Sequence, residues 1–325
     1  MRVKVKLQTI SPVSWGWYNR KTDPLKVRVT SIRGTLRKWY RWYLASISEP
    51  QPEEIRRKED EVFGTVHGEA RRSAVKIQFD SLEGLNNSQM EVLSKWGRKF
   101  YMMSFDLLME GKCEHLIEAA KALSLNVTLG GFGYRSNRGY GSFKISSIEG
   151  DSRECEEALN FLELAREVTN SSSKDSWEKN LSELLKSLGV RKLEGQEWNL
   201  YKVQNLSNCY ILTAKGDDDW EESLSELEEK LKEIERSSRP GGRNKKDYRV
   251  LLGFLVPING KMRRSSPLIL GLGNGYIRGV LFISKDYPKD VLDHFNGESG
   301  LLEGFDFVKK TIKSKFEVKW VGDLL

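Results

Sequence analysis

Three arginines recur every four residues in the segment RVTSIRGTLRKWYRW, residues 28–42. A helix over this segment would place them on a stripe separate from its apolar residues. The N–H groups at a helix start bind phosphate, and nearby arginines and hydroxyls strengthen such a site. The segment therefore predicts a phosphate site, with salt bridges from the arginines to the acidic segment 53–61 as the alternative. The candidate ligands are Thr30, Ser31, Arg33, Arg37 and Arg41.

A second candidate is the loop LGGFGYRSNRGYGSF, residues 129–143, which holds five glycines, two arginines and no acid. Ser136 takes the third glycine position of a dinucleotide-binding pattern, and no Gly-Lys-Ser/Thr occurs, so neither nucleotide loop is indicated. Such a backbone can approach a phosphodiester closely, whereas an ordinary glycine-rich hairpin is the alternative. The candidate ligands here are Gly131, Gly133, Arg135, Arg138, Gly139 and Tyr140.

Aromatic residues interleave with cations in two places, a pattern that suits the stacking of unpaired bases. Burial in the core is the alternative for any one of them. The first group is Trp15, Trp17 and Tyr18 beside Arg20 and Lys21, and the second is Phe132, Tyr134 and Tyr140 beside Arg135 and Arg138.

Charge is segregated along the chain, although the net value is only +7. Residues 1–48 hold eleven Lys/Arg against one acid, and residues 239–285 hold ten against one. Residues 217–235 hold ten acids and two lysines, and the spacing of Leu224, Leu227, Leu231 and Ile234 on one face predicts a solvated helix. Two basic blocks predict a polyanionic partner such as nucleic acid. The second block adds Lys261, Arg263, Arg264 and Arg278 as candidate RNA contacts.

The elements that must position these residues begin with a βαββαβ order, which predicts a ferredoxin-like or RRM-like antiparallel sheet with two helices on one face. The expected strands are 2–9, 73–79, 99–109 and 142–148, and the expected helices are 32–47 and 113–125.

The rest of the chain predicts a second, divergent copy of this fold after a helical connection. The connection holds helices at 155–168 and 176–188; after it come strands at 208–213, 250–256, 268–272, 276–283 and 316–321 and helices at 217–235 and within 301–313. The prediction is an α+β protein of two ferredoxin-like (RRM-like) domains with antiparallel sheets. Its divisions are 1–150 with the glycine-rich loop, 151–195 as the connection, and 196–325 as the second domain.

Other classes of protein are disfavoured. The longest nearly apolar run, residues 250–258, is nine residues long, too short for a membrane span. The N-terminus alternates as a strand does and does not resemble a signal peptide, so we expect a cytoplasmic protein with no membrane partner. Cys113, Cys155 and Cys209 show no CxxC spacing, so we expect reduced packing residues, with neither a disulfide nor a metal site.

Four motifs resemble RAMP-superfamily subunits of CRISPR effector complexes, with an order and spacing most similar to those of the type III-B (Cmr) complexes. They are SIRGTLRKWYRW at 31–42, VFG at 62–64, GGFGYRSNRGYGS at 130–142 and MRRSSPLILGL at 262–272. Such subunits have two ferredoxin-like domains within a ribonucleoprotein that uses a guide RNA to capture target RNA. The resemblance implies binding of guide RNA and target RNA beside other RAMP subunits, without catalysis, cofactor or metal.

Two alternatives remain open. A metal-independent RAMP endoribonuclease that processes guide-RNA precursors would need an acid/base residue, for which His67, His115 and His294 are candidates, and Asp23 could assist a metal-dependent cut. A scaffold that binds acidic protein partners through its basic surfaces is the other.

Overall fold

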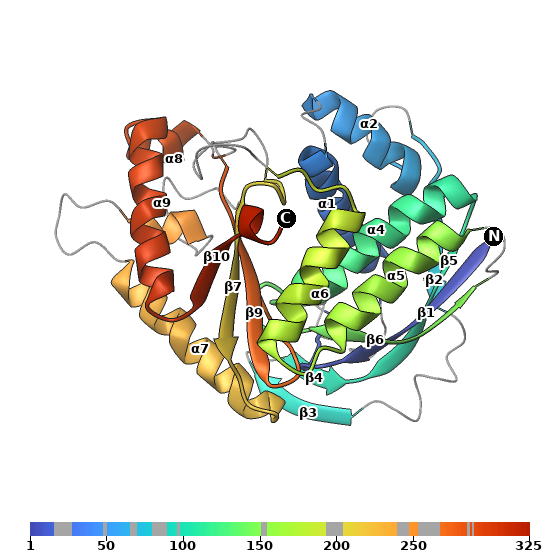
Figure 1. Ribbon diagram of the computed structural model, residues 1–325, viewed down its shortest axis with the longest axis horizontal. Coiled ribbons are helices and arrows are strands. Elements are labelled where there is room, and N and C mark those ends of the chain that lie inside the picture. The colour runs from blue at the N-terminus through green and yellow to red at the C-terminus, as the bar shows by residue number, and fades with distance from the viewer. Residues whose placement is uncertain are drawn as a thin grey trace.

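The computed structural model describes residues 1–15, 28–47, 51–65, 70–79, 90–95, 98–150, 155–192, 204–238, 247–252, 267–284, 287 and 289–325. Two antiparallel sheets lie on either side of a layer of helices (Figure 1). In that part of the chain, no helix combines the length and apolar composition that a membrane crossing requires.

The first sheet has the strand order β2-β5-β1-β6, and every neighbouring pair is antiparallel. Its strands are β1 (Arg2–Thr9), β2 (Lys76–Phe79), β5 (Ser104–Glu110) and β6 (Phe143–Gly150). Along β1, Val3, Val5 and Leu7 are buried while the lysines between them face outward, as the two-residue period of a strand requires. This order is that of the predicted βαββαβ fold.

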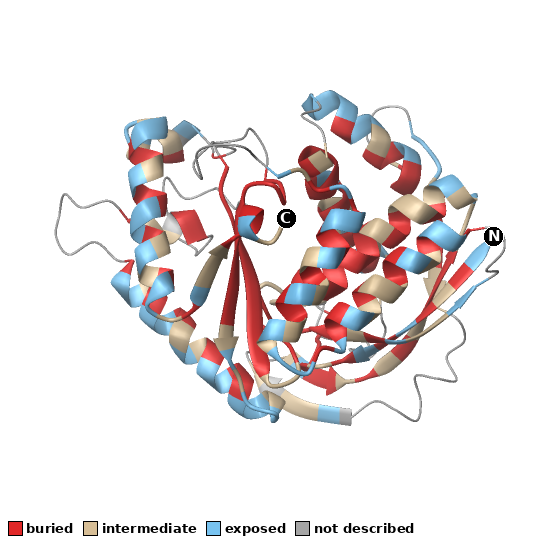
Figure 2. Cartoon of the chain, viewed as in Figure 1, coloured by how far each residue is buried: buried red, intermediate tan, exposed pale blue. Residues whose placement is uncertain are grey.

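Helices cover one face of this sheet, where Figure 2 shows their inward sides buried. They are α1 (Val29–Ile47) and α4 (Cys113–Leu129), and α2 (Pro52–Phe63) packs against both of them. The apolar stripe of α1 packs against α4 and buries Ile32, Leu36 and Trp39. The connecting helices α5 (Glu156–Thr169) and α6 (Lys174–Ser187) follow, with α5 packed against α4 and α6 against α5.

The second sheet repeats the connectivity of the first, in the order β10-β7-β9-β8. In each sheet the first strand lies between the third and the last. The strands are β7 (Cys209–Lys215), β8 (Leu268–Leu272), β9 (Tyr276–Phe282) and β10 (Glu317–Trp320), with helices α7 (Trp220–Ser237), α8 (Lys289–His294) and α9 (Glu298–Lys313). The antiparallel, two-sheet fold class predicted from sequence is therefore present.

Several segments differ from the expected elements, and the helices α2 and α8 were not expected at all. The single strand expected over 99–109 is two strands, β4 (Arg98–Met102) and β5, because Met103 turns to hydrogen-bond the backbone and hydroxyl of Thr9. Strand β4 pairs instead with β3 (Met90–Lys95), a hairpin that was not predicted. The strand expected over 250–256 begins as a 3₁₀ helix, Tyr248–Leu252, and 253–256 lie outside the described residues.

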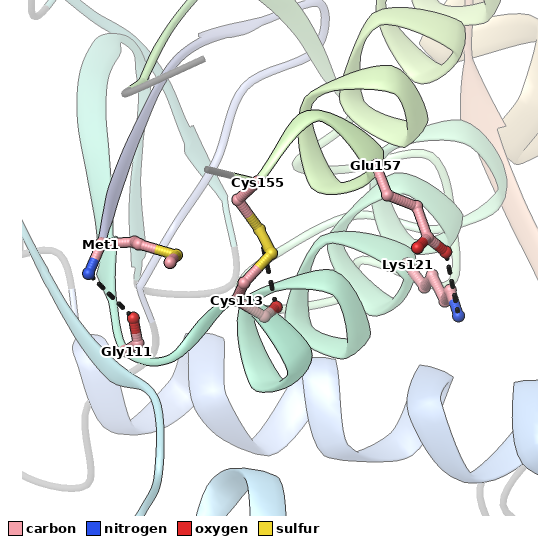
Figure 3. Close-up of a disulfide and its surroundings, with 6 residues drawn as sticks. All are labelled: Met1, Gly111, Cys113, Lys121, Cys155 and Glu157. Atoms are coloured by element: carbon pink, nitrogen blue, oxygen red, sulfur yellow. Dashed lines mark hydrogen bonds and ion pairs between the residues drawn. A yellow bond between two sulfur atoms is a disulfide. The ribbon is translucent and has the colours of Figure 1, made fainter. Parts of the chain in front are cut away.

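The prediction of three reduced cysteines is wrong for two of them. Cys113 at the start of α4 and Cys155 before α5 form a disulfide whose Cα atoms are 5.4 Å apart (Figure 3). The two residues are 42 positions apart in the chain, and the packing of α5 on α4 brings them together. Cys209 is free and buried, as expected of a packing residue.

Candidate nucleic-acid interface

A basic pocket of about 730 Å³ lies at the start of α1. It is formed by the first turns of α1, the end of α2 with the chain that follows it, and the approach to β2. Of the lining residues within the described part of the chain, five are cationic and none is acidic. The lining consists of Thr30, Arg33, Gly34, Arg37, Phe63, Gly64, Thr65, Arg71, Arg72, Ser73 and Lys76.

Backbone hydrogen bonds fix the wall of this pocket opposite α1. Thr65 and Arg71 exchange two of them, each 3.0 Å long, which hold these two residues together. The hydroxyl of Ser73 donates within this wall to the carbonyl oxygens of Val62 and Val75. At Gly64 φ is +73°, and a Cβ would lie 2.6 Å from the nitrogen of Ser73, so the approach of the two segments requires glycine.

The cations of the pocket differ in how they are engaged. The Nε of Arg33 is buried and has no hydrogen-bond partner among the described residues. Arg71 and Arg72 are exposed, and neither forms an ion pair with a described residue. Lys76 pairs with Glu110 at 3.1 Å on the surface. A buried donor without a partner costs free energy that an anion in the pocket would recover.

The two later arginines of the predicted stripe are engaged in salt bridges instead. Arg37 donates to Glu59 at 2.7 Å and to Asp60 at 2.6 Å, and Arg41 donates to Glu59 at 2.8 Å. Both acids belong to α2. The alternative of salt bridges to the segment 53–61 is therefore what the structure has, and Arg37 and Arg41 are not available as phosphate ligands in this conformation.

The predicted hydroxyls lie inside α1, which begins at Val29. Thr30 lines the pocket, whereas Ser31 is exposed outside it. The first turn of α1 holds no acid, so nothing there offsets its positive dipole end.

The glycine-rich loop packs against its own chain. A Cβ on any of three of its glycines would lie within 2.7 Å of another protein atom. For Gly131 that atom belongs to Gly141, for Gly133 to Ser14, and for Gly139 to the side chain of Leu227. These glycines make room for neighbouring protein, so the prediction that their backbone approaches a phosphodiester is wrong here. Tyr140 is also buried, and its hydroxyl donates to Glu228 of α7 at 2.7 Å.

This loop joins the two halves of the molecule. Gly139 N donates to Leu270 O at 2.9 Å, and Leu270 N donates to Asn137 O at 3.2 Å, which makes a parallel bridge to β8. Only its tip, from Gly133 to Arg138, keeps partial exposure, so Arg135 and Arg138 are the candidate ligands that solvent reaches.

The second basic block gives a correction. Arg278 on β9 is only 2% exposed, and its guanidinium donates to the carbonyl oxygens of Val127, Thr128 and Leu272. Burial lowers the pKa of Arg278 to about 10. Arg278 supplies hydrogen-bond donors to the free carbonyl groups at the C-terminal end of α4. The prediction that it extends an exposed RNA-binding surface is therefore wrong. Lys261, Arg263 and Arg264 lie outside the described residues.

The other aromatic and acid/base candidates are dispersed. Trp15 is buried against Phe105, and Trp17, Tyr18, Arg20, Lys21, Asp23 and His67 lie outside the described residues. His115 lies 3.6 Å from Glu114, and His294 accepts a hydrogen bond from Asp247 N. Among the described residues, no cluster of His, Cys, Asp or Glu is arranged to hold a metal ion.

Sequence reasoning missed Arg71, Arg72 and Lys76 as members of the pocket. Arg71 follows the VFG motif by seven residues, and tertiary packing brings the pair Arg71-Arg72 into the same pocket as Arg33. The adjacent pair of arginines is the one sequence feature that could have indicated this part of the pocket.

Comparisons with known proteins agree with this architecture. Residues 6–144 match the RAMP superfamily. The chain is 26% identical over 312 residues to the CRISPR system Cmr subunit Cmr1-1 of Pyrococcus furiosus, with 87% of this chain and 88% of that protein covered.

Solved structures share the fold over nearly the whole chain. The crystal structure of Cmr1 from Pyrococcus furiosus, apo form, superposes with a TM-score of 0.64 at 23% identity over 99% of both chains. A chain of the type III-B Cmr-beta complex bound to cognate target RNA and AMPPnP, in the presence of ssDNA, gives 0.64 at 14% identity and covers 95% of this chain and 99% of that one. Residues 6–144 thus match the RAMP superfamily, and the whole chain resembles subunit 1 of the type III-B Cmr complexes, as its motifs predict.

Proposed function

We propose that this chain is a non-catalytic RNA-binding subunit of a type III-B CRISPR ribonucleoprotein in the cytoplasm. It holds guide RNA and helps capture target RNA beside other RAMP subunits, in antiviral defence. Its likeness to a Cmr subunit, and to a chain of a Cmr-beta complex bound to cognate target RNA, supports membership of such a complex.

The basic pocket carries the RNA-binding part of the proposal. Arg33, Arg71 and Arg72 converge there with the start of α1, and no acid occurs among the described residues of the lining. Positive charge around backbone N–H groups binds phosphate oxygens without reading bases. Among the described residues of the lining, none is a histidine or a carboxylate that could act as a general base.

Gly34 offers a test that removes no contact. It is exposed on α1, lines the pocket, and has open space where a Cβ would stand. Gly34→Glu places a carboxylate at the pocket, so single-stranded RNA should bind at least ten-fold more weakly. The fold should be more stable by roughly 0.5–1 kcal/mol, because glycine is the poorest ordinary helix former.

Gly34→Gln is the matched control, since it has the same size and helix propensity without the charge. It should bind RNA within two-fold of the wild type. Equal RNA affinity for the Glu and Gln variants, measured by fluorescence anisotropy, would remove the pocket from the RNA path. Arg33→Ala with Arg71→Ala should also reduce the steepness of log affinity against log salt by about 1.4, since each phosphate contact contributes about 0.7.

The same titration tests catalysis when the RNA is end-labelled and analysed with and without EDTA. Intact, shifted RNA is the expected result. Discrete cuts that resist EDTA and copurify with the protein would instead favour the guide-RNA-processing endoribonuclease, and His115 and His294 would be the described residues to substitute first.

We also propose that the units are 1–150, 151–195 and 196–325. The two sheets belong to the first and last of these, and the stacked helices α5 and α6 support the middle one. Limited proteolysis of the full chain should yield fragments that end near residues 150 and 195, and cuts confined to other positions would contradict these boundaries.

A further inference from the structure

A cluster of arginines surrounds one tyrosine at the tip of the glycine-rich loop, away from the contacts that bury the rest of it. The guanidinium carbon of Arg98, on β4, lies 4.3 Å from the centre of the Tyr134 ring. The guanidinium carbon of Arg135 lies 5.7 Å from the same ring. Both arginines and the tyrosine are partly exposed. No sequence motif pointed to Arg98, which comes from the unpredicted hairpin β3–β4.

Backbone bonds hold the tip in place from both ends. Tyr134 N donates to Ser14 O at 2.7 Å, and Arg138 N donates to Arg135 O at 2.8 Å, which closes a turn. Arg135 itself has a φ of +57°, a left-handed conformation that is disfavoured for a residue with a Cβ. Strain of this kind is retained where the surrounding structure enforces it, and it concentrates at functional sites.

The hairpin that supplies Arg98 is fixed as firmly. Val13 and Tyr101 exchange two hydrogen bonds of 2.9 Å, which tie β4 to the chain after β1. At the other end of the hairpin, Lys95 pairs with Glu228 of α7 at 2.6 Å. Arg98 therefore meets Tyr134 between two anchored segments.

Exposure separates Tyr134 from the other aromatic residues of the loop. Phe132 and Tyr140 are at most 1% exposed, and Tyr140 packs against Phe100 with ring centres 4.9 Å apart. A base can stack only on a ring or guanidinium plane that solvent reaches. Within the loop, that requirement leaves Tyr134, and Arg98 extends its stack.

The electrostatics of the tip suit a nucleotide as well as a base. Hydrogen bonding from Arg135, against an opposing effect of burial, lowers the pKa of the Tyr134 hydroxyl. Burial and then the charge of Arg135 lower the pKa of Arg138, although Glu235 offsets part of this. Like charges held this close gain from an anion, and a phosphate attached to a stacked base supplies one.

We infer that Tyr134 and Arg98 form a stacking site for one unpaired nucleobase of single-stranded RNA, with Arg135 and Arg138 at the adjoining phosphate. This inference rests on the proposed RNA-binding function and adds to it. The pocket at α1 recognises phosphate alone, whereas this tip recognises the flat face of a base.

The test compares two RNA probes of equal length and charge, one intact and one in which abasic residues replace its bases. Tyr134→Leu should weaken binding of the intact RNA about 5- to 100-fold, the range of one lost base–aromatic stack. The same variant should change binding of the abasic RNA by less than two-fold. Tyr134→Phe, which keeps the ring, should retain wild-type affinity for both probes.

Arg98→Ala should have the same effect as Tyr134→Leu, with weaker binding of the intact RNA and nearly unchanged binding of the abasic RNA. Lys99→Ala is its matched control. Lys99 is the next residue on β4, is exposed, and pairs with Glu91 at 2.8 Å, so its loss removes the same charge without touching the stack. Equal losses on intact and abasic RNA would overturn the stacking site and leave a merely electrostatic patch, as would no loss from Tyr134→Leu.

The pocket variants separate this inference from the function on which it rests. If Gly34→Glu weakens RNA binding and Tyr134→Leu does not, the stacking site is wrong and the RNA-binding function stands. If the wild-type protein binds neither probe, both are wrong.

Discussion

Glu59 is the buried partner of Arg37, with its carboxylate 2.7 Å from the arginine Nε and the residue only 1% exposed. The same carboxylate also accepts from Arg41, so one acid of α2 holds two cations of α1. This contact fixes α2 against α1 and, with it, the wall of the basic pocket. It also draws two arginines away from that pocket.

Glu59→Ala should therefore separate stability from RNA binding. We expect a loss of about 2–3 kcal/mol of unfolding free energy in urea, because the charged hydrogen bonds from Arg37 and Arg41 to a buried acid disappear, while Arg37 keeps Asp60. RNA affinity, measured below the unfolding transition, should stay constant, since Asp60 still holds Arg37 and no cation of the pocket is removed. Glu61→Ala, exposed on the same helix, should change neither by much. A parallel fall in RNA affinity would mean that Glu59 supports the RNA site itself.

Glu228 predicts an acid-dependent component of stability. Burial raises the pKa of its carboxyl, but hydrogen bonds from Lys95 and Tyr140 outweigh this and lower the pKa below 4.5. A depressed carboxyl pKa stabilises the fold above the unfolded value and loses that contribution as pH falls through the folded value. Glu228→Gln should cost about 1–2 kcal/mol at pH 7 and nothing near pH 2. Thermal unfolding from pH 7 to pH 2 measures this, and a constant difference would refute it.

The Cys113–Cys155 disulfide should be visible in thiol chemistry and in heat stability. Denatured, unreduced protein should expose one reactive thiol, that of Cys209, and reduced protein three. The loop-entropy estimate for a 42-residue separation is about 4 kcal/mol, so dithiothreitol should lower the melting temperature by several degrees. A Cys209→Ala variant should keep this shift. Three reactive thiols before reduction would contradict the bridge.

Arg135→Gly should make the protein no less stable while it weakens RNA binding. Glycine adopts the left-handed conformation at this position without a Cβ penalty, so relief of strain offsets the greater freedom of the unfolded chain. The lost guanidinium should reduce RNA affinity several-fold in the same sample. Calorimetry and anisotropy titration provide the two readouts, and a destabilised variant would show that Arg135 serves the fold.

Much of the fold follows from local patterns. The alternation in β1 and the apolar stripe of α1 placed both elements within a few residues of their observed bounds. Two copies of the βαββαβ order then implied two antiparallel sheets. The hairpin β3–β4 escaped prediction because its strands are stabilised by contacts distant in sequence, such as Lys95 with Glu228.

The site was predicted less well, because the sequence shows where a charged residue stands but not which residue its side chain contacts in the fold. Arg33 and Arg37 share one stripe of α1. The buried Nε of Arg33 has no hydrogen-bond partner among the described residues, whereas Arg37 donates to Glu59. In the sequence Arg278 belongs to a basic block, but in the fold it is buried against the C-terminal end of α4, whose carbonyl groups it caps. Such differences depend on tertiary packing, which a single sequence does not display.

The bridge between Arg138 and Leu270 also bears on solubility. Strand β8 ends its sheet, and all five of its residues are buried. An uncovered outer strand of this kind offers unpaired backbone groups to any other chain and is a common origin of aggregation. The glycine-rich loop hydrogen-bonds to β8 at this outer edge, so the segment that presents Tyr134 also occupies backbone groups that another chain could otherwise pair with.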